Sequence, residues 1–175
     1  MSPEPIKEPY YKYYRSLVKA EDLFAALEDS LEEQVSFFRG MSSDKADYRY
    51  ASDKWSIKEI LQHLIDTERI FVYRALTFLR EPGVELPGYD HENYVINCPL
   101  DQVSFDELIE EFRQVRCSSL SFYRNADKEL LNNVGIANGN KMSVDDIGRI
   151  LVGHAKHHIA MISERYLLPP HGLLL

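Results

Sequence analysis

Apolar residues recur at steps of three and four along four long segments of the chain. This spacing places them on one face of an α-helix. The first segment ends at Gly40, and its repeating positions are Leu23, Phe24, Leu27, Leu31, Gln34, Val35 and Phe38. No segment keeps the two-residue alternation of a β-strand for long, so the pattern predicts an all-α fold.

The other three segments begin with similar helix-start signals. Ser56 and Ser104 are each followed three residues later by a glutamate, and Ser143 is followed by Asp146. In such a capping box the hydroxyl accepts a hydrogen bond from a free N–H of the first turn, and the acid suits the positive end of the helix. The boxes and the apolar runs behind them predict helices over residues 57–80, 105–125 and 144–167.

Four helices of about 20 residues, each about 30 Å long, predict a four-helix bundle. The connections over residues 40–55 and 81–103 exceed the roughly 2–8 residues that usually join bundle helices, so we expect a long crossover between the second and third helices. The chain, residues 1–175, is predicted to form a single domain. Within it, residues 1–15 are predicted to form an extended N-terminal lead-in whose tyrosines pack on the body or cover an opening.

Composition narrows the class of protein. The net charge of −8 disfavours a nucleic-acid or anionic-membrane partner, because either needs a basic surface. No apolar run approaches the roughly 20 residues that span a bilayer, and the first residues lack the apolar stretch of a signal peptide. Cys98 and Cys117 make no disulfide framework, so we expect a cytoplasmic protein.

The predicted fourth helix carries two histidines in its apolar stripe. At 100° per residue from Ile147, His154 lies at about 340° and His158 at about 20°, one turn apart in the centre of the stripe. Histidines at i and i+4 point the same way and can share one metal ion. The alternative is a pair of core histidines that hydrogen-bond to carbonyls or facing acids. His157 falls on the flank of the stripe, where a surface or supporting role is expected.

A third ligand would come from a facing helix, and the predicted second helix offers His63 at the edge of its apolar stripe. His91 and His171 are weaker candidates, for which simple exposure is expected. Asp66 and Glu68 are either solvated charges or acids that hold the free N–H of a metal-bound histidine. The polar and aromatic residues 89–94 either close over a site or cap the end of the bundle.

Several known kinds of catalytic and metal site are excluded because their sequence motifs are absent. The chain lacks H-E-x-x-H of zinc proteases, Glu-x-x-His of di-iron carboxylate bundles and the paired cysteines of structural zinc sites. It also lacks the glycine-rich phosphate loops and the G-x-S-x-G nucleophile motif.

Two stretches of the chain resemble the DinB-like family. Residues 54–68, KWSIKEILQHLIDTE, resemble the W-s-x-x-E-x-L-x-H-L-x-D-x-E stretch of that family, and residues 153–160 resemble its H-x-x-x-H helix. The order of one histidine on the second helix and a pair on the fourth also fits, and Tyr89-Asp90 fits more loosely. The resemblance covers roughly residues 20–167.

The resemblance implies a bundle of the DinB/YfiT-like arrangement, with a divalent metal held by His63, His154 and His158. Family members bind various divalent metals, and zinc, nickel, iron and manganese are the candidates here. They often form homodimers, so the resemblance implies a homodimer here, and they include S-transferases and isomerases that use bacillithiol, mycothiol or glutathione. The family name refers to DNA-damage induction, but the acidic charge of this chain gives no support for DNA contact.

Two hypotheses follow from the histidines and the resemblance. The first is a metal-dependent enzyme that transfers a low-molecular-weight thiol to an electrophilic small molecule, with Arg69, Arg74 or Lys141 as candidates to hold carboxylates of the thiol. The second is a non-catalytic, metal- or small-ligand-binding bundle with a role in stress response. A plain bundle with satisfied core histidines is the third possibility.

Overall fold

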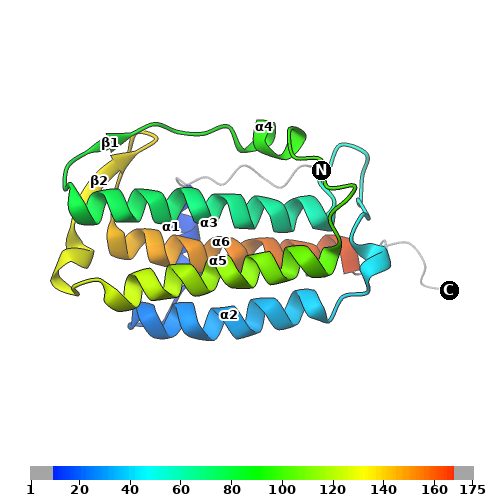
Figure 1. Cartoon of the computed structure of the whole chain (residues 1–175), viewed down its shortest axis with the longest axis horizontal. Helices are drawn as coiled ribbons and strands as arrows, with labels where there is room; N and C mark the ends of the chain where they lie inside the picture. Colours follow the sequence, from blue (N-terminus) through cyan, green and yellow to red (C-terminus); the bar gives the residue numbers. More distant parts are fainter. Residues whose placement is uncertain (1–9, 168–175) are drawn as a thin grey trace.

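The computed structural model describes residues 10–167, and its body is a bundle of four long helices (Figure 1). The helices have the bounds α2 (Leu23–Arg39), α3 (Ile57–Arg80), α5 (Phe105–Asn125) and α6 (Val144–Ile162). The sequence predicted all four, and α6 continues as a π-helical turn, η3 (Ser163–Leu167). Short 3-10 helices, η1 (Ser43–Lys45) and η2 (Glu129–Asn132), lie in the connections.

All three predicted capping boxes are present. The Ser56 hydroxyl accepts a hydrogen bond from the Glu59 N–H, while the Glu59 carboxylate accepts one from the Ser56 N–H at 2.6 Å. Ser104 caps α5 in the same reciprocal way. Ser143 does so for α6, with the shorter Asp146 carboxylate 3.0 Å from the Ser143 N–H. Each box satisfies two backbone donors, so these helix starts are fixed locally.

The helices enclose a continuous apolar core. α3 packs against α5 and α6, and α2 packs against the same two helices, so consecutive α2 and α3 lie diagonally across the bundle. The largest fully buried apolar side chains are Phe38, Phe78, Phe112, Leu27, Ile57, Ile60, Leu61, Ile65, Leu108, Met142 and Ile147. Burial of this apolar surface is the main force that holds the helices together.

An ion pair crosses this core. Arg116 donates to both carboxylate oxygens of Glu68, with Nε–Oε1 at 2.7 Å and Nη2–Oε2 at 2.9 Å. Arg116 Nη1 also donates to the Ser30 hydroxyl and to Gln34 Oε1. The pair therefore ties α3, α5 and α2 together through charge-assisted hydrogen bonds.

The long crossover between α3 and α5 is confirmed. These two helices run in the same direction, and the segment between them returns along the length of the bundle (Figure 1). It is more structured than the predicted loop, because it contains strand β1 (Glu85–Leu86) and helix α4 (His91–Ile96). The Asp90 carboxylate caps α4 by accepting from the Asn93 N–H.

A small sheet, which the sequence analysis did not predict, joins the crossover to the chain before α6. Strand β1 pairs in parallel with β2 (Val134–Ala137), which pairs antiparallel with β3 (Asn140–Ser143). The hairpin turns at Asn138 and Gly139, whose φ angles are 51° and 72°. Asn-Gly between short apolar runs is a strong hairpin signal, but strands of four residues show little alternation.

The N-terminal lead-in is not extended over its described part. Residues Tyr10–Ser16 form a short helix, α1, that lies across α6. Residues 1–9, with the rest of the predicted lead-in, lie outside the described residues, as does His171. Among residues 10–167, no helix combines the length and apolar character needed to cross a membrane.

Gly153 allows α1 to sit close to α6. A Cβ built at Gly153 would lie 1.9 Å from the Tyr14 carbonyl oxygen. Helix propensity alone favours alanine over glycine by about 1 kcal/mol, but this backbone oxygen cannot move independently of α1. We therefore expect Gly153→Ala to displace α1 and to lower the free energy of unfolding by about 1–3 kcal/mol.

Chymotrypsin cleavage in the tyrosine-rich α1 measures the displacement, and cleavage should become faster in Gly153→Ala. The exposed Ala160, also on α6, provides the control, because Ala160→Gly changes helix propensity without adding an atom. Unchanged cleavage in a more stable Gly153→Ala protein would contradict the prediction.

Candidate metal centre

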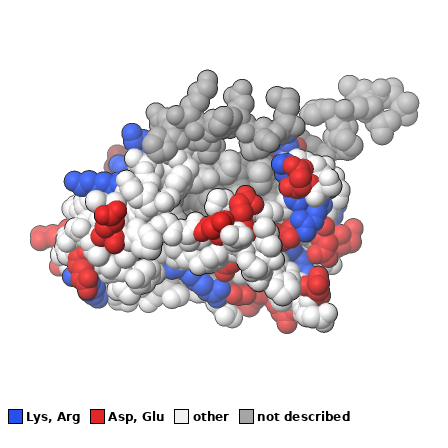
Figure 2. All heavy atoms as spheres, turned by 90° about the horizontal axis from the view of Figure 1, so that it is seen from above, with Lys and Arg blue, Asp and Glu red and all other residues white. Residues whose placement is uncertain are grey.

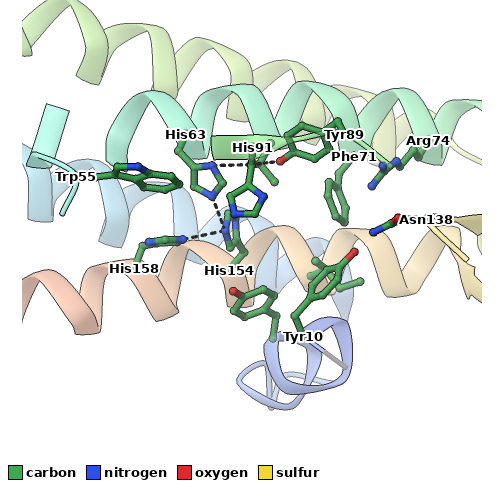
Figure 3. A pocket seen from close by; sticks show the side chains of 13 residues that line it. Tyr10, Trp55, His63, Phe71, Arg74, Tyr89, His91, Asn138, His154 and His158 are labelled. Atoms are coloured by element: carbon green, nitrogen blue, oxygen red, sulfur yellow. Dashed lines mark hydrogen bonds between the residues drawn. The ribbon is translucent and has the colours of Figure 1, made fainter. Parts of the chain in front are cut away.

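The three predicted histidines converge on one point between two packed helices (Figure 3). His63 comes from α3, and His154 and His158 come from α6. The Nε2 atom of His154 lies 3.1 Å from that of His63 and 3.0 Å from that of His158. One ligand atom from each residue lies within 4.8 Å of the others, which makes the trio a candidate metal-binding group.

Helix geometry explains the convergence. His154 and His158 are one turn apart and point the same way. The stripe edge where the sequence placed His63 faces α6, because α3 packs against α6 along its length. The three side chains are nearly buried, with exposed fractions of 7%, 7% and 8%.

Burial keeps these imidazoles neutral. Removal from water lowers the pKa of His63 to about 3, and the neighbouring His91 acts in the same direction. The pKa values of His154 and His158 are also far below the usual range, first through burial and then through the adjacent histidines. A neutral imidazole offers the lone pair that a metal ligand requires.

The Nε2 separations of His154 from His63 and from His158 fit a single divalent ion. Two nitrogens each about 2.0–2.1 Å from one ion are about 2.8–3.4 Å apart at octahedral or tetrahedral angles. In the described part of the chain, the three Nε2 atoms find hydrogen-bond partners only in one another, and His158 Nδ1 is buried without a partner. Core histidines held by carbonyls or acids would show such partners, so the arrangement favours ligation.

The histidines form one wall of a cavity of about 330 Å³. Its other walls come from α1, from the middle of α3, from the crossover and from the hairpin turn. The lining residues are Tyr10, Tyr14, Trp55, His63, Thr67, Phe71, Arg74, Tyr89, His91, Asn138, Ile150, His154 and His158. A cavity of this size accommodates a small molecule beside the histidines.

Neither Asp66 nor Glu68 accepts a hydrogen bond from a histidine N–H among the described residues. Glu68 pairs with Arg116 in the core and points away from the histidines. The Asp66 carboxylate accepts a hydrogen bond from Gln62 Nε2 at 3.0 Å. The hydroxyl of Thr67 takes the place next to His63, 3.5 Å from Nδ1. Thr67 is at i+4 on α3, so this neighbour was within reach of sequence reasoning.

Aromatic residues surround the imidazoles. The Trp55 ring lies 4.9 Å from the His63 ring between centroids, and the Tyr14 ring lies 5.0 Å from the His154 ring. Tyr14 belongs to α1, so the described part of the lead-in packs on α6 and also lines the cavity. The Tyr89 hydroxyl, from the crossover, lies 2.7 Å from the Thr67 hydroxyl, so residues 89–94 border the site.

The other histidines and the three basic candidates differ in whether they line the cavity. His91 lines the cavity although its side chain is 53% exposed, and His157 packs against Tyr13 and Tyr14 outside it. Arg69 pairs with Glu111 on α5, and Lys141 is exposed on β3. Of the three basic candidates, Arg74 lines the cavity.

A sequence model of the DinB superfamily matches residues 26–162, which is most of the chain. The chain belongs to the DinB superfamily. A search of curated proteins finds no match. The stretch that matches the superfamily contains all three converging histidines and the whole crossover.

Solved structures contain a similar fold. YfiT from Bacillus subtilis aligns with a TM-score of 0.72 at 15% identity, covering 93% of this DinB-superfamily chain and 90% of the YfiT chain. YfiT is described as "a probable metal-dependent hydrolase with an unusual four-helix bundle topology". The likeness shows that this DinB-superfamily protein has the same four-helix-bundle fold as YfiT.

Proposed function

We propose that this protein is a metal-dependent enzyme that acts on a small molecule in the cavity, with a divalent ion held by His63, His154 and His158. One observation carries the proposal: three buried, neutral imidazoles present their Nε2 atoms to one point on the wall of a 330 Å³ cavity. The description of YfiT as a probable metal-dependent hydrolase supports the same class of function.

A divalent ion bound there would act as a Lewis acid and would lower the pKa of a water or thiol beside it. The residues around the histidines prepare the site for this chemistry. Trp55 and Tyr14 shield the imidazoles from bulk water, which strengthens electrostatic interactions within the cavity. The Thr67 hydroxyl, itself hydrogen-bonded to Tyr89, lies beside His63 Nδ1 and favours the orientation that turns Nε2 inward.

Three protein ligands beside an accessible cavity are typical of catalytic rather than structural metal sites. Hydrolysis by an activated water is the first candidate reaction. Thiol transfer to an electrophile is the second, and the lining supports it because none of the 13 lining residues within the described range 10–167 is an aspartate or glutamate. A thiol, with an ordinary pKa of about 8.5, needs a general base less than water does.

Elemental analysis of tag-free protein tests the metal site. We expect about one transition metal per chain in the wild type and none in His154→Ala/His158→Ala, because loss of two of three ligands removes the shared binding point. His157→Ala, one residue from the pair but outside the cavity, is the matched control and should retain the ion. Absence of metal from the wild type, together with failure to take up zinc, nickel, iron or manganese, would contradict the proposal.

Activity and stability measurements then separate an enzyme from a non-catalytic binding bundle. The metal-loaded protein is assayed for hydrolysis of small esters and amides, and for conjugation of bacillithiol or glutathione to common electrophiles. A catalytic ion in this self-sufficient bundle should be removable by chelation with little loss of stability, whereas a structural ion would take much of the stability with it. Strong destabilisation without any turnover would favour the non-catalytic bundle.

A further inference from the structure

A buried cation lies at the end of the cavity away from the histidines (Figure 3). Arg74 is on α3, 11 residues after His63, and 11 steps of 100° return to within about 20° of the same helix face. The two Cα atoms are therefore about 16 Å apart along the helix axis, with Thr67 and Phe71 between them on the cavity wall. Arg74 is only 3% exposed.

The guanidinium of Arg74 is held in place without an acid. Its Nη2 donates to the Pro87 carbonyl oxygen at 3.0 Å. Its Cζ lies 4.9 Å from the centroid of the Phe71 ring and 5.7 Å from that of Tyr89. Within residues 10–167, Arg74 forms no ion pair, in contrast to the core Arg116, which is neutralised by Glu68. Of its five N–H donors, only the one to Pro87 has a hydrogen-bond partner among these residues, and Arg74 lines the cavity.

A second polar group is fixed at the same end. Asn138 occupies the first turn position of the β2–β3 hairpin, with φ at 51°. Its side chain packs against the backbone at Gly88, where an added Cβ would lie within 2.8 Å of the Asn138 amide carbon. Strand pairing of β1 with β2 therefore positions the Asn138 amide beside the Arg74 end of the cavity (Figure 3).

The charge balance of the cavity calls for an anion. Among residues 10–167, its lining contains a permanent cation and no acidic residue. On the face in Figure 2, acidic and basic side chains are interspersed and form no broad basic patch among the residues drawn in colour. A buried charge is costly unless it is paired, and Arg74 would be paired by an anionic ligand.

We propose that Arg74 and Asn138 form a carboxylate-binding subsite, and that the substrate is a small molecule whose carboxylate lies several bonds from the group that reacts at the histidines. The planar guanidinium matches the two oxygens of a carboxylate, and one cation balances one negative charge. A phosphate shares the oxyanion chemistry, but its second negative charge would have no partner here. The substrate assignment rests on the proposed function, whereas anion binding by Arg74 does not.

The only tryptophan in the chain, Trp55, lines the cavity and reports its occupancy. Fluorescence titration of metal-free, full-length protein with hexanoate should saturate. Hexanamide, which has the same chain without the charge, and inorganic phosphate should each bind at least about tenfold more weakly. Charge-assisted hydrogen bonds are worth about tenfold to a hundredfold in affinity, so Arg74→Met should weaken hexanoate binding by that factor.

Two further variants keep the test decisive. Arg69→Met removes an arginine that pairs with Glu111 outside the cavity, and it should bind hexanoate as the wild type does. Asn138→Gly accepts the positive φ but lacks the amide, so a loss of about threefold to tenfold is expected even if Arg74→Met does not fold. Equal binding of hexanoate and hexanamide, or unchanged binding in Arg74→Met, would overturn the proposed anion-binding subsite. Preferred binding of phosphate would overturn the assignment of a carboxylate as its ligand.

The design separates this proposal from the proposed function. All titrations use metal-free protein, so they can succeed where no metal site exists. Conversely, Arg74→Met should retain the same metal content as the wild type, because Arg74 is three helical turns from His63. Loss of metal in Arg74→Met would show that the residue supports the histidines, which would overturn its assignment to a separate subsite.

Discussion

Metal-free protein is expected to lose stability steeply as the pH falls from 6.5 to 4.5. Burial lowers the pKa of His63 from 6.5 to about 3, so in this window the unfolded chain binds a proton that the folded chain does not. The free energy of unfolding therefore decreases with falling pH, by about 1.36 kcal/mol per pH unit for each such group. His63 alone accounts for about 2.3 kcal/mol between pH 6.5 and 4.5, and His154 and His158 add losses in the same direction.

Urea unfolding at the two pH values, with a chelator present, measures this loss. His63→Gln should show a smaller decrease than the wild type, since glutamine removes one group with a lowered pKa. Titrating groups away from the three histidines contribute to both proteins and cancel in the comparison. The same exchange at His91, whose side chain is 53% exposed, controls for removal of an imidazole next to the cavity. Equal pH dependence in wild type and His63→Gln would contradict the prediction.

Breaking the core ion pair should have the second large effect. The side chains of Arg116 and Glu68 are 1% and 2% exposed, so Arg116→Met leaves a carboxylate buried without its partner. We expect a loss of about 3–5 kcal/mol in the free energy of unfolding. Replacing both residues, in Glu68→Leu/Arg116→Met, should recover much of the loss, because neither charge is then buried.

A double-mutant cycle by urea unfolding measures this coupling. The surface pair of Arg69 and Glu111, at 2.8 Å, offers a matched comparison on the same two helices, and Arg69→Met should cost less than about 1 kcal/mol. The metal content of Glu68→Leu/Arg116→Met should equal that of the wild type, because Glu68 is engaged by Arg116 and not by the histidines. Additive effects of the two single replacements would show that the pair contributes no coupling.

Sequence reasoning reached the helices because their signals are local. The apolar spacing and the serine caps involve residues within one or two turns, and the structure has the corresponding hydrogen bonds at Ser56, Ser104 and Ser143. The short strands and α1 were missed for the converse reason. The pairing of β1 with β2 joins residues about 50 positions apart, and α1 depends on a close approach of Tyr14 to Gly153.

The residues of the candidate site also differ in whether local sequence signals could place them. His154 and His158 could be paired from their spacing alone, since i and i+4 share a helix face. His63 needed either the family resemblance or the packing of α3 against α6. Glu68 could not be assigned from the sequence, because its partner Arg116 is 48 residues away. Arg74 was one of three basic candidates until the structure placed it on the cavity wall.

By itself, then, the sequence determined the four helices, their starts and the face on which the histidine pair lies, because these depend on interactions between near neighbours in the chain. Only the tertiary structure decided which polar groups meet. It directed Glu68 into the core and Thr67 toward His63, and it placed Arg74 and Asn138 at one end of a cavity with the histidines at the other. The physical reason is that such meetings depend on how helices and strands distant in sequence pack, and packing is set by the burial of the whole core.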